Sequence, residues 1–381
     1  FESDLVYKAI SQLFDTVSDF KFLSQKLAIF NEDDGYPIIN GESIDFRKCK
    51  PDNYSIKIDP IENPIGLLNL GATCYINVVI QQLFNICDFR NELEGLIESF
   101  KEGDDQNEHK MILSLNQLFN ELQQSYLLVA NPSDFIENFG GIDVKVHNDC
   151  CEFFLQLIDR LNIEIFNCKF KNVISAIDDE NLSVESFENF TVLPLSIRNL
   201  SNIDESFDRL FDFDYFTGDN GYIFDSGNGK VDAMKNCVIE SLSGHLIIQL
   251  ERFEYNHETQ EREKISSFFQ FYDSLCLNEE EFVLTGVVVH LGESADCGHY
   301  ISYIRKPDKS DDSDVKSFSD SWFKYNDSEV TEVTLDEVME DGYENGYLLF
   351  YTQSDANLTN ETFSDESIVE LNAESTVARM I

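Results

Sequence analysis

Apolar and polar residues repeat with one period in the first half of the chain and with another in the second half. Apolar residues recur at helical spacing over 75–86, 109–126 and 148–166. Residues three and four positions apart lie on one face of a helix, so these stretches predict three helices. The first stretch follows a glycine-rich turn, and Thr73 stands where a helix cap is expected.

From about residue 187 the apolar residues gather in short runs that are bounded by turn residues, which is typical of strands. These runs lie at 191–197, 244–255, 282–292, 299–306 and 346–353. A helical first half followed by a strand-rich second half predicts an α+β fold, because a parallel α/β sheet would need alternating helices and strands.

Three segments differ from the rest in composition. Residues 1–62 mix apolar and acidic residues, and we expect a separate N-terminal segment or the end of a preceding domain. Residues 308–320 form an acidic, serine-rich loop. The end, 354–381, carries six acidic residues and one Arg and is expected to be disordered or a linker.

The charge balance excludes two classes of partner. The chain has 27 Lys and Arg against 72 Asp and Glu, a net charge of −45, whereas nucleic acids and anionic membranes are bound by clustered basic residues. No stretch approaches the roughly 18 to 20 apolar residues of a membrane span. We therefore expect no nucleic-acid partner and no membrane partner.

The cysteines indicate a reducing compartment. Nine cysteines, an odd number, are scattered along the chain without the regular spacing of a disulfide framework. Reduced thiols are the rule in the cytosol and nucleus, so we expect a cytoplasmic or nuclear protein.

Cys74 is the candidate nucleophile, because it follows a turn and begins a predicted helix. The free N–H groups and the dipole of a helix start stabilise a thiolate, which is the nucleophilic form of cysteine. The alternative is a small buried hydrophobic residue, which explains the other eight cysteines better. His299 could act as the base, and Asn326 could orient its ring. From the residues alone, contact between Cys74 and His299 stays open.

Two longer patterns decide between these readings. The pattern G-L-x-N-x-G-A-T-C-Y-x-N-x-x-x-Q-x-L at 66–83 resembles the cysteine box of the ubiquitin-specific proteases. The pattern T-G-V-V-V-H-L-G-x-S-A-D-C-G-H-Y-I-S-Y-I at 285–304 resembles their histidine box. Further family-like segments lie at 148–154, 246–255, 322–330 and 346–351. Within the family, the chain is most similar to the large fat-facets or X-linked type 9 members.

This resemblance implies a catalytic domain over 63–353 with a papain-like cysteine protease fold. Its parts would be a helical thumb at about 63–165, β-stranded fingers at about 166–245, and a palm made mainly of 246–353. It also implies hydrolysis of the isopeptide or peptide bond after the C-terminal Gly-Gly of ubiquitin, through a thioester. The expected partners are ubiquitin and ubiquitinated proteins.

The resemblance assigns a catalytic role to five residues. Cys74 would be the nucleophile and His299 the general base. Asn326 takes the place of the residue that orients the histidine, and Asp327 beside it is expected to supply charge or to polarise the oxyanion site. The side chain of Asn69 would donate a hydrogen bond to the oxyanion.

Four further residues are expected to contact the substrate. By resemblance, Asp149 and Glu152 would pair with the arginines of the basic ubiquitin tail, where bidentate geometry is favourable. Gly298 and Tyr300, which flank the base, would line the channel for that tail. The alternative for the two acids is a solvated helix face.

The chain departs from the family pattern where many relatives bind zinc in the fingers. A tetrahedral thiolate site needs four spaced ligands, usually two C-x-x-C pairs, and this chain contains none. The pairs would fall near 175–178 and 224–227. We therefore expect no metal and no other cofactor, with hydrophobic packing holding the fingers together.

Two other functions stay open. The chain could be a catalytically impaired ubiquitin-binding module, or a protease for another ubiquitin-like modifier with a Gly-Gly tail. The first requires a lost catalytic group, and the second differs only in surface recognition.

Overall fold

The computed structural model describes residues 64–101, 105–124, 129–179, 181–225, 229–256, 260–294, 297–307 and 318–354, with short strands at 38–39, 42–43 and 370–371. The chain divides into two compact units, Phe1–Lys57 and Ile58–Ile381. Of the first unit, only the antiparallel pair β1 (Ile38–Ile39) and β2 (Glu42–Ser43) is described. Most of the predicted segments 1–62, 308–320 and 354–381 therefore lies outside the described residues.

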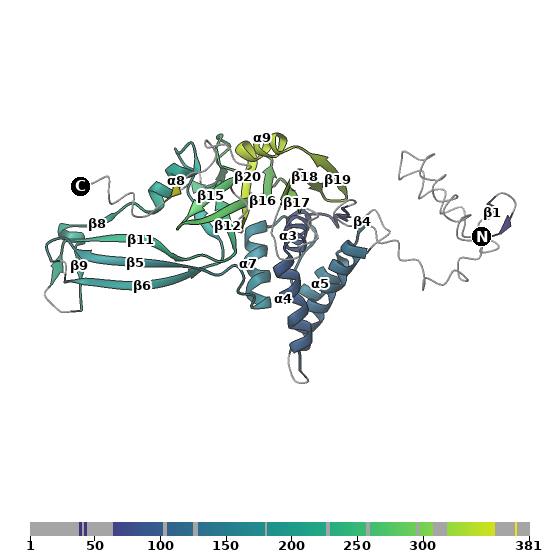
Figure 1. Cartoon of the computed structure of the whole chain (residues 1–381), viewed down its shortest axis with the longest axis horizontal. Helices are drawn as coiled ribbons and strands as arrows, with labels where there is room; N and C mark the ends of the chain where they lie inside the picture. The colour runs from purple at the N-terminus through teal and green to yellow at the C-terminus, as the bar shows by residue number, and fades with distance from the viewer. Residues whose placement is uncertain are drawn as a thin grey trace. The chain divides into compact units, whose positions relative to one another are not determined.

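Five of the described helices precede the main sheet of the second unit and pack together (Figure 1). They are α3 (Cys74–Asn85), α4 (Cys87–Ser99), α5 (Gln106–Gln124), α6 (Ser133–Phe139) and α7 (Cys150–Leu161). The three predicted helices correspond to α3, α5 and α7. Helix α3 is buried from Cys74 to Leu83, because it is apolar around most of its circumference and packs between α7 and a strand of the main sheet.

The main sheet has nine strands in the order β19-β18-β17-β16-β20-β12-β7, with β15 paired to β16 and β21 paired to β15. Their bounds are β7 (Leu193–Leu195), β12 (His245–Leu250), β15 (Ser274–Leu277), β16 (Glu280–Leu291), β17 (His299–Pro307), β18 (Phe318–Asn326), β19 (Glu329–Val333), β20 (Gly346–Gln353) and β21 (Glu370–Leu371). Only the pairs β7–β12 and β15–β21 are parallel. Each of the five predicted strand runs overlaps one of these strands.

Both faces of this sheet are buried, because alternate residues of a strand point to opposite sides. Val288 of β16 packs with the helices α3 to α7, whereas its neighbours Val287 and Val289 pack on the other face with Val338. Val338 belongs to α9 (Leu335–Asn345), which covers that second face (Figure 1). A mostly antiparallel sheet with segregated helices confirms the predicted α+β fold.

A second sheet projects from this body (Figure 1). It has the order β6-β5-β11-β8, made of β5 (Cys168–Ala176), β6 (Ser183–Phe190), β8 (Asp214–Phe216) and β11 (Ala233–Ser241). These strands fall within the range predicted for the fingers. The remaining described elements are β3 (Gly66–Leu67), β4 (Val129–Ala130), α8 (Ile203–Leu210), η3 (Gly218–Asn220), β9 (Tyr222–Ile223), β10 (Lys230–Val231), β13 (Phe253–Asn256) and β14 (Glu261–Lys264).

An apolar cluster fills the end of the projecting sheet where relatives would bind zinc. Ala176 pairs with Ala233, and both pack against Phe224. The ring of Tyr222 meets Phe224 edge-on, with 4.8 Å between centroids. These side chains offer no thiolate or imidazole, so they do not fit a zinc site. Across the described ranges, no group of three or more His, Cys, Asp or Glu residues is arranged to hold a metal.

The helices in the described part of the chain were compared with the requirements for a membrane-spanning helix. None of them is both long enough and apolar enough to cross a bilayer.

Candidate active site

Cys74 is the first residue of α3 and is held by the turn before it. Its side chain is only 1% exposed. Ala72 donates a backbone hydrogen bond of 2.6 Å to the carbonyl of Val144. Gly71 has φ +144°, and a Cβ there would lie 2.6 Å from the same carbonyl oxygen. The glycine therefore allows the close approach that fixes the turn and points Cys74 into the helix start.

The expected role of Thr73 as a side-chain cap is wrong. Its hydroxyl makes no capping bond to the first turn of α3. Instead it accepts a hydrogen bond of 2.9 Å from the backbone N–H of Leu70 and donates one of 3.2 Å to Oδ1 of Asn69. The hydroxyl thus stabilises the preceding turn. The first hydrogen bond of the helix is accepted by the backbone carbonyl of Thr73 from the N–H of Asn77.

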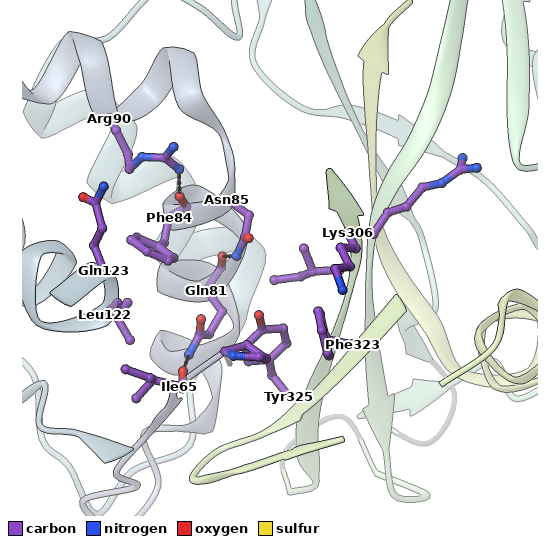
Figure 2. A pocket seen from close by; sticks show the side chains of 13 residues that line it. Ile65, Gln81, Phe84, Asn85, Arg90, Leu122, Gln123, Lys306, Phe323 and Tyr325 are labelled. Atoms are coloured by element: carbon purple, nitrogen blue, oxygen red, sulfur yellow. Dashed lines mark hydrogen bonds between the residues drawn. The ribbon is translucent and has the colours of Figure 1, made fainter. Parts of the chain in front are cut away.

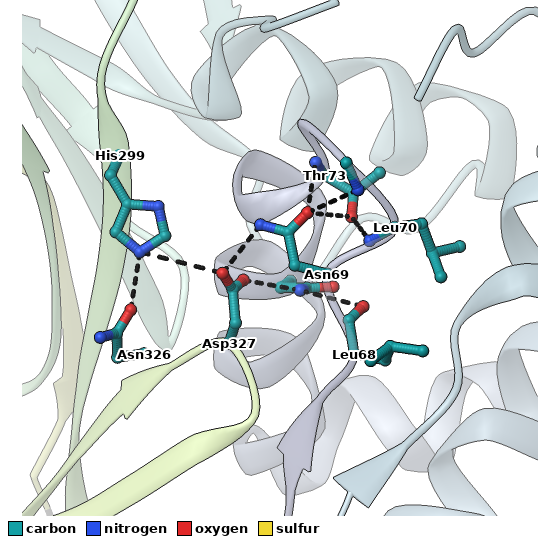
Figure 3. A network of polar contacts seen from close by, with 9 residues as sticks. Leu68, Asn69, Leu70, Thr73, His299, Asn326 and Asp327 are labelled. Atoms are coloured by element: carbon teal, nitrogen blue, oxygen red, sulfur yellow. Dashed lines mark hydrogen bonds and ion pairs between the residues drawn. The ribbon is translucent and has the colours of Figure 1, made fainter. Parts of the chain in front are cut away.

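His299 and Asn326 are brought together by neighbouring antiparallel strands. His299 is the first residue of β17, and Asn326 is the last residue of β18. Nε2 of the imidazole lies 2.6 Å from Oδ1 of Asn326 (Figure 3). An amide oxygen only accepts, so Nε2 donates here. Nδ1 is then the ring nitrogen left to face Cys74.

The histidine is strongly basic in this setting. A hydrogen bond with Cys74 is the largest cause that raises the pKa of His299 to about 9. Burial opposes the rise, while the bond to Asn326 and the charges of Cys74 and Asp327 add to it. The imidazole therefore keeps its proton at neutral pH, which makes it a suitable partner for a Cys74 thiolate. The structure thus brings the three predicted triad residues together.

Asp327 lies between the histidine and the turn that precedes Cys74 (Figure 3). Its Oδ2 accepts a hydrogen bond of 2.8 Å from Nδ2 of Asn69, and its Oδ1 accepts one of 2.8 Å from Nδ2 of Asn77. Nε2 of His299 lies 3.8 Å from Oδ2. The carboxylate therefore supplies a negative charge beside the imidazole and orients two amide side chains.

The backbone of Asp327 is fixed as tightly as its side chain. Asp327 has φ 51°, in the left-handed region that aspartate tolerates better than most residues. Its carbonyl accepts a hydrogen bond of 2.8 Å from the N–H of Leu67. A Cβ on Gly66 would lie 2.6 Å from that same oxygen. Strand β3 therefore docks onto the turn after β18 only because residue 66 is glycine.

Asn69, the predicted oxyanion donor, is held at both ends of its amide. Its Oδ1 accepts from the N–H groups of Gly71 at 2.9 Å and Thr73 at 3.2 Å. One hydrogen of its Nδ2 goes to Asp327. An amide nitrogen carries two hydrogens, so the second hydrogen is the one that could be donated in a hydrogen bond to an oxyanion.

Two residues of α3 escaped the sequence analysis. Asn77 lies one turn after Cys74 on the same helix face and holds Asp327; the only signal was its place in the cysteine-box pattern. Gln82 donates to Oγ of Ser302 at 2.9 Å and to the carbonyl of Tyr303 at 3.0 Å, which ties α3 to β17. A Cβ on Gly286 would lie 2.0 Å from its Oε1, so a glycine is needed there.

A cavity of about 220 Å³ adjoins the histidine, and we call it the Gly298 cavity. All four predicted substrate contacts lie among its lining residues, which are His147, Asn148, Asp149, Glu152, Arg262, His290, Cys297, Gly298 and Tyr300. A Cβ on Gly298 would lie 2.3 Å from Nε2 of His290. Burial lowers the pKa of His290 to about 4, so this ring is neutral at physiological pH.

The two predicted acidic contacts differ in their surroundings. Asp149 caps α7, because its Oδ1 accepts from the N–H groups of Cys151 at 2.8 Å and Glu152 at 3.1 Å. Its Oδ2 accepts from the hydroxyl of Tyr347 at 2.5 Å. Glu152 is exposed, and it accepts a 3.1 Å bond from Gln156. Glu152 is therefore the acid that can turn toward a ligand without loss of an internal network.

Comparison with known proteins agrees with this geometry. The family model "Ubiquitin carboxyl-terminal hydrolase" matches residues 65–351. Ubiquitin carboxyl-terminal hydrolase 15 of Schizosaccharomyces pombe is 30% identical over 304 residues, which cover 73% of this chain and 25% of that protein. Ubiquitin carboxyl-terminal hydrolase 9Y of Mus musculus is 27% identical over 367 residues, which cover 73% and 14%. The chain thus spans about a quarter or less of these relatives.

The fold is also similar to that of solved structures. The SAGA Ubp8/Sgf11/Sus1/Sgf73 DUB module bound to ubiquitin aldehyde matches with a TM-score of 0.64 and 22% identity, over 79% of this chain and 71% of that one. The same module with a substituted Ubp8, bound to monoubiquitin, matches with a TM-score of 0.65 and 21% identity over the same shares of the two chains. The chain has the α+β catalytic fold of ubiquitin-specific proteases, and it belongs to the ubiquitin carboxyl-terminal hydrolase family of deubiquitinating enzymes.

Proposed function

We propose that this chain is a cysteine protease that hydrolyses the isopeptide or peptide bond after the C-terminal Gly-Gly of ubiquitin. The observation that supports this most directly is the hydrogen-bonded series Cys74–His299–Asn326, whose members come from α3, β17 and β18. A nucleophile, a base within reach and a group that orients the base are the parts that acyl transfer needs.

In the first half of the reaction, the Cys74 thiolate attacks the carbonyl carbon of the last glycine. The carbonyl oxygen becomes negative and receives hydrogen bonds from the second Nδ2 hydrogen of Asn69 and from the backbone N–H of Cys74. The imidazolium of His299 passes its proton to the leaving amine. The C–N bond breaks, and a thioester joins Cys74 to ubiquitin.

In the second half, neutral His299 takes a proton from water as the water attacks the thioester carbonyl. The C–S bond then breaks, which restores the thiolate and releases ubiquitin with a free carboxylate. Asn326 cannot neutralise the imidazolium, but Asp327 lies 3.8 Å from the ring and can offset its charge. Asp327 thus stabilises the charged ring while it orients Asn69.

The Gly298 cavity supports a tail that ends in two glycines. The cavity is small, about 220 Å³, and Gly298 in its lining cannot carry a side chain, because a Cβ there would lie 2.3 Å from Nε2 of His290. Glu152 offers a carboxylate to a basic residue of the tail, and Asp149 offers its remaining lone pairs. The two similar structures were solved with ubiquitin aldehyde and monoubiquitin, which supports ubiquitin as the ligand here.

Two narrower proposals accompany this function. The cysteine and histidine boxes favour kinship with the X-linked type 9 group. The 9Y relatives match at 26–27% identity, and the fission yeast hydrolases match at 30%. A cytoplasmic or nuclear location is supported by the odd number of cysteines and by their irregular spacing, which does not indicate a disulfide framework.

Turnover of a ubiquitin C-terminal fluorogenic amide tests the proposal. We expect release of the fluorophore by the full chain, and loss of at least about a thousandfold in Cys74→Ala, because the residual rate must come from binding and the oxyanion site alone. Cys87→Ala is the matched control, since Cys87 is exposed at the start of the next helix. An inert chain that still binds ubiquitin would favour the impaired binding module.

A further inference from the structure

A second cavity, of about 310 Å³, lies at the far end of the helix that carries Cys74 (Figure 2). We call it the α3-end cavity. Phe84 and Asn85 of the last turn of α3 form part of one wall, and Phe323 and Tyr325 of β18 form part of the other. Helix α3 has 12 residues, so Cys74 lies about 16 Å away along its axis. The cavity shares no lining residue with the Gly298 cavity.

The walls of the α3-end cavity belong to the elements that carry the active site. Helix α3 provides Cys74, β17 provides His299 and β18 provides Asn326. Tyr325, in the cavity wall, directly precedes Asn326. An occupant of this cavity would therefore touch the helical part of the domain and the sheet at the same time.

The polar groups within the walls are already paired. Nε2 of Gln81 donates to the carbonyl of Ile65 at 2.8 Å, and Nδ2 of Asn85 donates to the carbonyl of Gln81 at 2.8 Å. The Tyr325 side chain is hydrogen-bonded to Asn85. The apolar part of the lining includes Phe84, Leu122 and Phe323.

Two half-exposed cations belong to the cavity lining, and Nη1 of Arg90 already donates to the carbonyl of Phe84 (Figure 2). The Arg90 guanidinium lies over the ring of Phe84, 5.4 Å from its centroid, and Nζ of Lys306 lies 5.6 Å from the centroid of Phe323. Neither cation pairs with a carboxylate within the described residues. None of the described lining residues is acidic, although the chain has 72 acidic residues against 27 basic ones.

We propose that the α3-end cavity binds a small aromatic anion, such as an aryl carboxylate. Its ring would lie between Phe84 and Phe323, and its carboxylate would accept a hydrogen bond from Nζ of Lys306. The volume is at the lower end of the range for small-molecule sites, about 300 to 1,000 Å³. The remaining cation of the lining, Arg305, is engaged with the carbonyl of Ser319 and with Asp320.

Calorimetric titration with 1-naphthaleneacetate tests this site on the Cys74→Ala chain, so that binding is measured apart from the proposed protease activity. We expect saturable binding of one molecule per chain. The loss of one half-exposed ion pair should weaken binding about fivefold in Lys306→Gln, and the neutral 1-naphthaleneacetamide should bind about fivefold more weakly. Leu122→Trp should fill the cavity and abolish binding.

Lys324→Gln is the matched control. Lys324 lies over the ring of Tyr303 at 5.4 Å on a neighbouring position of β18, outside the cavity lining, so the same charge is lost without a change at the site. This variant should bind 1-naphthaleneacetate as the parent chain does. The proposal is overturned by absence of saturable binding at millimolar concentration, by equal affinity for the acetamide, or by equal weakening in Lys324→Gln and Lys306→Gln.

Discussion

Asn69 donates a hydrogen bond of 2.8 Å from Nδ2 to Oδ2 of Asp327, across 258 positions of sequence. This bond joins the turn before the nucleophile to the turn after the strand that carries Asn326. It also couples two roles that are usually assigned to separate residues, because the carboxylate that orients the oxyanion donor also lies 3.8 Å from the imidazole. The site thus behaves as one network from Asn77 to His299.

We expect Asp327→Asn to lower kcat/KM by about a hundredfold, with little change in KM. The substitution removes the negative charge and sets an NH₂ group against Asn69 or Asn77, so the oxyanion donor loses its orientation, which typically costs about 10² to 10³ in rate. Fluorogenic ubiquitin amide kinetics measure this. Glu329→Gln, on the exposed start of β19, serves as the control. A loss of less than about threefold in Asp327→Asn would contradict the role given to the carboxylate.

Asn326 should be replaceable by aspartate but not by alanine. Asn326→Asp keeps an acceptor for the Nε2–H of His299 and adds charge, so we expect kcat/KM within about fivefold of the parent chain. Asn326→Ala removes the acceptor and frees the ring to rotate, and we expect a loss of about 10- to 100-fold. The same kinetic assay separates the two. Equal losses in both variants would show that the side chain acts by packing alone.

The pH dependence should carry the signature of a strongly basic histidine. Hydrogen bonding to Cys74 raises the pKa of His299 from 6.5 to about 9, so the protonated ring persists through neutral pH and is lost as the pH rises through about 9. Since this proton goes to the leaving amine, kcat/KM for an amide substrate should fall above about pH 9. The stabilisation that the raised pKa gives to the fold is complete below about pH 6.5 and is lost over the same rise.

A profile of kcat/KM from pH 6 to pH 10 measures this alkaline fall in activity. Asn326→Ala removes the hydrogen bond between His299 and Asn326, which is one cause of the raised pKa of His299, so the fall in kcat/KM should move to lower pH. A parent profile whose alkaline limb lies near 6.5 would contradict the ion-pair account of Cys74 and His299.

Gly66→Ala should destabilise the fold and lower activity together. The added methyl group would lie 2.6 Å from the Asp327 carbonyl, which is backbone and cannot move aside cheaply, so we expect a loss of about 1 to 3 kcal/mol in the free energy of unfolding. Gly95→Ala is the matched control. Nothing lies within 4 Å of a Cβ there, and Gly95 is in α4, so alanine should stabilise by about 0.5 to 1 kcal/mol. Urea unfolding measures both, and equal stability of Gly66→Ala and the parent chain would refute the close approach.

Much of the fold was predictable because its signals are local. The apolar run at 75–86 is helical in α3, and the run at 282–292 lies in β16, where alternate valines face opposite sides of the sheet. The order of such runs was enough to indicate an α+β architecture. The juxtaposition of Cys74, His299 and Asn326 came from the family resemblance, since no periodicity reports contact over that separation.

The partners of individual polar side chains could not be read from the sequence. Thr73 was expected to cap the helix, but its hydroxyl is hydrogen-bonded to Asn69 and Leu70 in the preceding turn. Asp149 was assigned to the substrate by resemblance, and nothing in the sequence indicates that its Oδ2 also accepts a hydrogen bond from Tyr347, 198 positions away. Asn77 went unnoticed because only the fold brings Asp327 to it. In each case a hydrogen bond set by the folded chain decides the role, and local pattern carries no information about it.

The most direct test of the central claim is reaction with ubiquitin that bears a C-terminal electrophile, followed by mass-spectrometric mapping of the modified cysteine. We predict one ubiquitin per chain, attached to Cys74, and no adduct in Cys74→Ala. Cys297 is the internal control, because it is exposed and lines the Gly298 cavity, where the tail of ubiquitin is proposed to bind. An adduct on Cys297, or no adduct on a folded parent chain, would contradict the assignment of Cys74 as the nucleophile that attacks the end of ubiquitin.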